Sequence, residues 1–115
     1  LCAPINYYTL AKNVLDIAIN LHKKGAKIHE ALHSLSHSDE AVNAKFIEIE
    51  DSLTLQISDR LASLGADSPN LGERIHFAMD IVQSFSHEYV FDNHPYIDYD
   101  AMRTIVENTI VALFI

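Results

Sequence analysis

The sequence predicts an all-α fold: five helices in an orthogonal or antiparallel bundle. Apolar residues recur at helical spacing in five segments, and only three glycines and three prolines occur among the 115 residues. Because 49% of the residues are hydrophobic and 21% are charged, the composition is typical of a globular chain. A chain of this length buries one core, so we expect a single domain over residues 1–115.

The first two helices are predicted over residues 5–24 and 26–36. Pro4 suits an initial helical position, Lys23 and Lys24 favour the negative end of a helix, and Gly25 separates the two segments. The apolar stripe of the first helix consists of Tyr7, Leu10, Val14, Ile17, Ala18 and Leu21, widened by Tyr8, Leu15 and Ile19. The expected buried side of the second consists of Ile28, Ala31, Leu32 and Leu35.

A third helix is predicted over residues 39–64, with a capping oxygen from Ser38 or Asp39. Its apolar stripe consists of Val42, Phe46, Ile49, Leu53, Ile57, Leu61 and Leu64. Residues 47–57 also alternate like two strands joined at Asp51 and Ser52. We favour the helix, because its period continues through the supposed turn and an isolated hairpin would have no sheet to join.

Gly65 and the turn residues 66–70 precede a fourth helix over residues 71–91, and Asp98 or Asp100 caps a fifth that runs to Leu113. The stripe of the fourth helix consists of Leu71, Ile75, Ala78, Val82, Phe85 and Tyr89, broadened by Met79, Ile81 and Val90. The fifth helix carries Met102, Ile105, Val106, Thr109, Ile110 and Leu113. The apolar arc of the fourth helix is wider than one core-facing side requires.

The charge balance and the motifs exclude several classes of function. Sixteen acidic and eight basic side chains give a net charge of −8, which disfavours direct contact with nucleic acid or an anionic membrane. Cys2 is the only cysteine, so we expect no internal disulfide and a cytoplasmic location. The apolar runs are shorter than the roughly 20 residues that cross a bilayer. Without a nucleophile elbow or phosphate-binding loop, no enzyme activity, catalytic residue or cofactor is expected.

Histidines are frequent and two sets of them share a helix face. His22, His29, His33 and His37 are spaced by seven, four and four residues, and this face points away from the predicted core. A second set, on the fourth helix, consists of His76, Asp80, Gln83 and His87. Either set offers ligands for a metal, but neither supplies a converging coordination shell, so we favour solvated polar faces and predict no metal ligand. A histidine-rich metal-binding bundle is the alternative function.

Several segments, in this order, resemble the C-terminal domain of TetR-family transcription regulators. They are residues 38–42, 60–65, 70–94 and 98–113, and residues 21–32 are similar to that family's junction between a long and a short helix. The chain departs from the family in two respects. The helix-turn-helix is missing from this sequence, and Gln83 and Ser84 stand where the fourth helix often has a small residue.

The resemblance implies an effector-sensing homodimer, most simply a repressor, that contacts DNA only through a missing N-terminal domain. The fourth and fifth helices of two subunits would form a four-helix bundle, with interface residues Phe85, Tyr89, Ile105, Thr109 and Ala112. A small, largely apolar effector would contact Leu15, Ile19, His22, Phe46, Ile49, Leu53, Phe77 and Ile81. A helical protein-interaction module without a ligand is a further alternative.

Overall fold

Five α-helices account for most of the chain in the structure, a computed structural model that describes residues 4–115 apart from the side chains of Ala26 and His29. The helices are α1 (Tyr7–Lys24), α2 (Ala26–Ser36), α3 (Glu40–Ser63), α4 (Leu71–Phe91) and α5 (Tyr99–Ala112). The described residues contain no strand. The predicted all-α class and the helix through residues 47–57 are therefore confirmed, and the hairpin alternative is wrong.

Short local signals define where the helices begin and end. The side chains of Asn6, Asp39 and Asp98 accept hydrogen bonds from backbone N–H groups in the first turns of α1, α3 and α5. Helix α1 consequently begins after Asn6, two residues later than predicted. Between α3 and α4 the backbone is left-handed at Gly65, with φ of 102°, and at Asn70, with φ of 57°. Glycine and asparagine are the residues that tolerate this conformation best, so the connection follows from its sequence.

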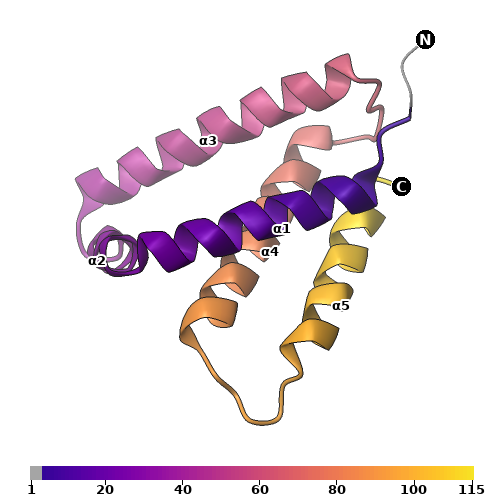
Figure 1. The fold of residues 1–115 in the computed structure, drawn as a ribbon. Coiled ribbons are helices and arrows are strands. Elements are labelled where there is room, and N and C mark those ends of the chain that lie inside the picture. Colours follow the sequence, from indigo (N-terminus) through magenta and orange to yellow (C-terminus); the bar gives the residue numbers. More distant parts are fainter. Residues whose placement is uncertain (1–3) are drawn as a thin grey trace.

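Helices α1, α4 and α5 form the larger part of the fold, and α2 and α3 form the smaller part (Figure 1). Helix α1 crosses the antiparallel pair α4 and α5 and packs on both. Helix α3 contacts α2 and α4, but among the described residues it does not pack against α1. The radius of gyration is 15.4 Å, whereas a compact chain of this length has about 13 Å. The fold is therefore open on the side between α1 and α3.

The core lies where α1 meets α4 and α5. Ala11, Leu15 and Ile19 are spaced by four residues and form the buried face of α1. They pack against residues of the other two helices: Ala78, Val82, Phe85, Val106, Ile110 and Val111. The core face of α1 is thus the one predicted only to widen its stripe. Leu10, Val14, Ile17 and Leu21, which the pattern places at the centre of the buried stripe, are exposed.

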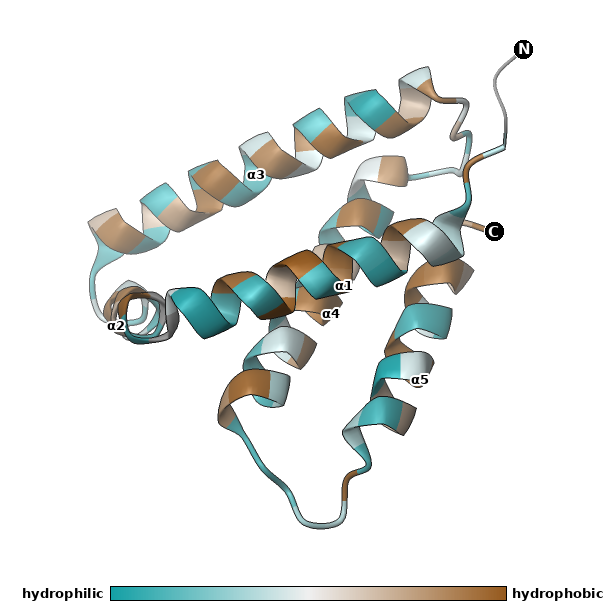
Figure 2. Cartoon of the chain, viewed as in Figure 1, coloured by the Kyte–Doolittle hydropathy of each residue, from teal (hydrophilic) through white to brown (hydrophobic). Residues whose placement is uncertain are grey.

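The apolar stripes of α2 and α3 are covered far less than predicted. Along α3 only Leu61 and Thr54 are buried, and Ile49 and Leu53 remain 47% and 44% exposed. Figure 2 shows hydrophobic and hydrophilic residues alternating along α3. Helix α2 contributes no buried hydrophobic residue to the described core. The physical reason is the arrangement of the helices, because α1, the nearest source of apolar cover, packs on α4 and α5 instead.

A partly exposed ion pair joins α5 to α1. The guanidinium of Arg103 donates to Asp16 at 2.6 Å and to Glu107 at 3.0 Å. Burial acts to lower the pKa of Arg103, but the two carboxylates outweigh it and raise the pKa above its ordinary value. At the other end of α5, Arg74 donates to the carbonyl oxygen of Leu113 at 2.6 Å. Both contacts fix the direction in which α5 lies against its neighbours.

The division of α1 into a core face and an open face predicts unequal effects of truncation. Leu15 is fully buried and Ile17 is 59% exposed. We expect Leu15→Ala to lower the free energy of unfolding by about 2 to 5 kcal/mol, because it leaves a cavity in the core. The matched control, Ile17→Ala, should change it by less than about 0.5 kcal/mol. Urea unfolding followed by circular dichroism measures both, and equal losses would contradict the assignment of the two faces.

Candidate functional site

A cavity of about 350 Å³ lies between α1, α3 and α4 and reaches the end of α5. Its volume falls within the range of about 300 to 1,000 Å³ that small-molecule sites occupy. It is partly open to solvent. The site therefore exists because α1 and α3 are held apart by their separate contacts with α4 and α2.

Helix α1 supplies the long wall of the cavity. The lining residues from this helix are Tyr7, Leu10, Ala11, Val14, Ala18, Leu21 and His22. Most of them belong to the apolar stripe predicted from the sequence, and steps of three and four residues keep them on one side of the helix. The centre of this face lies about 100° around the helix from Leu15 and Ile19, because successive residues turn by that angle. Helix α1 therefore has two adjacent apolar faces, one in the core and one on the cavity.

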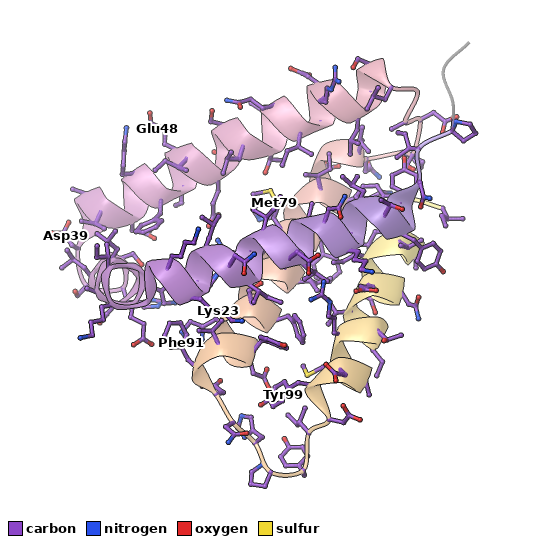
Figure 3. All side chains as sticks on the ribbon, in the orientation of Figure 1. Lys23, Asp39, Glu48, Met79, Phe91 and Tyr99 are labelled. Atoms are coloured by element: carbon purple, nitrogen blue, oxygen red, sulfur yellow. The ribbon has the colours of Figure 1, made fainter. Side chains whose placement is uncertain are left out.

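Helices α3 and α4 supply the opposite walls. Ile57 and Leu61 come from α3, and the residues from α4 are Ile75, Ala78, Met79, Val82 and Gln83. Figure 3 shows Met79 lying between α3 and α1, where its sulfur is 3.5 Å from the hydroxyl oxygen of Thr54. A methionine side chain adapts to ligands of different shape, since it is unbranched and polarisable. The wall at Met79 can thus adjust to the shape of a bound molecule.

His22 is the most buried polar residue of the lining. It is 5% exposed, and its Nδ1 donates to the carbonyl oxygen of Ala18 at 2.7 Å. Because a carbonyl oxygen only accepts, this contact places a proton on Nδ1 and fixes the orientation of the ring. Among the described residues, none that lines the cavity is an aspartate, glutamate, lysine or arginine. The arrangement suits the binding of an uncharged apolar molecule.

No family model, no curated protein and no solved structure matches this chain. Within the part of the chain that the structure describes, no helix is both long enough and apolar enough to cross a membrane.

Of the eight residues predicted to contact an effector, only His22 lines this cavity. Leu15 and Ile19 are in the core, Ile81 packs against it, and Phe77 is 55% exposed. Phe46, Ile49 and Leu53 precede Ile57 and Leu61, the lining residues of α3, and do not line the cavity. The difference arises because helical spacing assigns residues to a face but does not state which neighbour that face meets.

The missed lining residues did leave a signal in the sequence. The apolar arc of α1 extends from Leu10 through Val14 to Leu15 and Ile19, which is wider than a single contact with α4 and α5 needs. The sequence pattern describes this arc as one stripe that Leu15 and Ile19 widen. Its excess width instead indicates a second surface. Leu61 and Met79, in contrast, could be assigned to the cavity only once the helix positions were known.

The residues predicted for a dimer interface fall into two groups. Phe85 is 3% exposed and belongs to the core of its own chain, and Tyr89 is half-buried. Ile105, Thr109 and Ala112 are exposed and follow one another by four and three residues on the outer face of α5. Only the second group is therefore open to another subunit in the structure as it stands.

Histidines from three helices meet at the corner of α1, α2 and α4. The ring of His87 lies 6.5 Å from that of His22 and 6.4 Å from that of His33, measured between centroids. Its Nε2 is 3.4 Å from a carboxylate oxygen of Glu30. His33 also lies 4.9 Å from His37, whereas the side chain of His29 falls outside the described residues. The sequence pattern places His22, His33 and His37 in one set and His87 in another, and it does not predict that the two sets meet.

His76 lies elsewhere on α4, where its Nε2 is 3.7 Å from Asp80 in an exposed pair. It also borders a shallow hollow between α3 and α4 that contains Asp51 and Glu73. Among the described residues, no group of three or more histidine, cysteine, aspartate or glutamate side chains is placed to hold a metal ion.

The chain contains no tryptophan, so a single introduced tryptophan reports on the cavity. Met79 lines the cavity, and Phe77, two residues earlier on α4, is 55% exposed. We expect Met79→Trp to fluoresce at shorter wavelength than Phe77→Trp and to be quenched less by acrylamide, because its indole is shielded from water. Indistinguishable emission and quenching in the two variants would contradict the shielded position of Met79 in the cavity.

Proposed function

We propose that this chain is the effector-binding and dimerisation domain of a TetR-type transcription regulator. The observation that carries the proposal is the uncharged, apolar cavity between α1, α3 and α4. It is supported by the resemblance of residues 38–42, 60–65, 70–94 and 98–113 to that family's C-terminal domain. With a net charge of −8, the chain would rely on a separate basic domain for contact with DNA.

The open fold suggests how binding would act at a distance. A molecule in the cavity would touch α1 and α3, which otherwise do not pack together, so binding favours conformations in which the two helices approach. A ligand shifts a conformational equilibrium by its difference in affinity for the two states. In a dimer, movement of α1 would change the separation of two attached DNA-binding domains, and the operator affinity would change with it.

Dimerisation through the outer faces of α4 and α5 is the second part of the proposal. The exposed apolar face of α5, formed by Ile105, Thr109 and Ala112, has the spacing of a helix-packing surface. A second subunit would cover Ile105, which is 65% exposed in the single chain. Met102 and Tyr89, both partly buried, border the same pair of helices.

The cavity should bind an apolar fluorescent probe such as N-phenyl-1-naphthylamine. At a free concentration one hundred times Kd, binding to the folded state adds about 2.7 kcal/mol of stability, which a thermal unfolding scan detects. We expect Ala18→Phe to weaken binding at least about tenfold, because the new ring fills the cavity. The control is Ala44→Phe, at an exposed position of α3. An equal loss of affinity in both variants would place the probe elsewhere.

Sedimentation equilibrium tests the dimer. The wild-type chain should be dimeric at micromolar concentration, and Ile105→Glu should raise the dissociation constant at least about tenfold by placing a charge in an apolar interface. The control, Ile17→Glu, introduces the same charge at a similarly exposed isoleucine of α1. A monomeric wild-type chain, or an equal effect of both substitutions, would count against an interface on α5.

A further inference from the structure

The cavity is long. Its α1 wall extends from Tyr7 to His22. Fifteen residues at 1.5 Å each make this wall about 22 Å long. A molecule that contacts the whole wall must therefore be elongated.

The two ends of the cavity differ in chemistry. At one end the ring of Tyr7 stacks on that of Phe114, with centroids 5.2 Å apart and planes 8° from parallel. At the other end lie His22 and Gln83. Gln83 is on the same side of α4 as His87, one turn earlier, and the ring of His87 is near that of His22. Polar side-chain groups therefore gather at the His22 end, and an aromatic pair closes the Tyr7 end.

The charge of the site restricts the ligand further. No lining residue carries a lysine or arginine charge to neutralise an anion, and the net charge of −8 repels one at longer range. No lining carboxylate is present to pair with a cation. Burial of an unpaired charge in such a site is costly. An uncharged ligand meets none of these penalties.

Building on the proposed function, we infer that the effector is a single-chain amphiphile with an uncharged polar head, such as a long-chain alcohol or ester. Its tail runs along α1 toward Tyr7 and Phe114, and its head lies at His22 and Gln83. The side-chain amide of Gln83 can both donate to and accept from such a head. The occupant is thus an elongated chain oriented by one polar end, and not a compact ring system.

Displacement of N-phenyl-1-naphthylamine by straight-chain primary alcohols from octanol to octadecanol tests the inference. Each added methylene should tighten binding about fourfold, the equivalent of about 0.8 kcal/mol. The gain should stop when the chain fills the cavity, which at about 1.2 Å per bond occurs near eighteen carbons. Dodecanoate and dodecylamine should bind at least about tenfold more weakly than dodecanol, because their heads are charged.

The position of the head is tested with Gln83→Leu. This variant should weaken the binding of dodecanol about threefold to tenfold, the range expected for one lost hydrogen bond. The control is Gln56→Leu, on α3 outside the cavity, where the amide contacts Ser52. Both glutamines are exposed, so neither replacement removes a core side chain.

The outcomes separate the two proposals. If adamantanol displaces the probe as well as dodecanol does, or if affinity does not depend on chain length, the amphiphile inference is overturned while an apolar effector site remains. If Gln83→Leu and Gln56→Leu behave alike, the assigned orientation is overturned. If calorimetry detects no binding of the probe or of any alcohol, the proposed effector-binding function is itself overturned and the inference falls with it.

Discussion

The packing of one face of α1 on α4 and α5 is the constraint on which the rest of the structure depends. Leu15 and Val111, both almost fully buried, lie at the centre of this contact. Once that face of α1 is committed, the neighbouring face, with Val14 and Leu21, has to point toward the space beside α4. Helix α3 packs on α2 and α4, and it borders the same space from the opposite side. The cavity is therefore a direct result of how the core is formed.

Much of the fold could be predicted from the sequence, because its local signals are strong. The capping oxygens of Asp39 and Asp98 and the break at Gly25 place helix ends within about two residues of their positions in the structure. In α3, the helical spacing of apolar residues extends over the whole helix and outweighs the short alternating stretch within it. These features depend on neighbours within about four residues, and such neighbours are known from the sequence alone.

The site could be predicted only in part, since it depends on which helix meets which. The resemblance implies that His22, Phe46 and Phe77 contact an effector, but of these three only His22 lines the cavity. Phe85 was assigned to a subunit contact and is in the core. Each of these phenylalanines lies on an apolar helix face, as expected. Which neighbouring helix that face contacts depends on how the helices cross, and the spacing of apolar residues does not encode the crossing.

The two apolar faces of α1 also bear on how such a domain changes over generations. Leu15 and Ile19 hold the core together, whereas Val14, Leu21 and Met79 meet whatever enters the cavity. Val14 and Leu21 are exposed whereas Leu15 and Ile19 are buried, so a substitution on the second surface removes less core packing than one on the first. Descendants of this chain can therefore diverge in chemical preference at a smaller cost in stability.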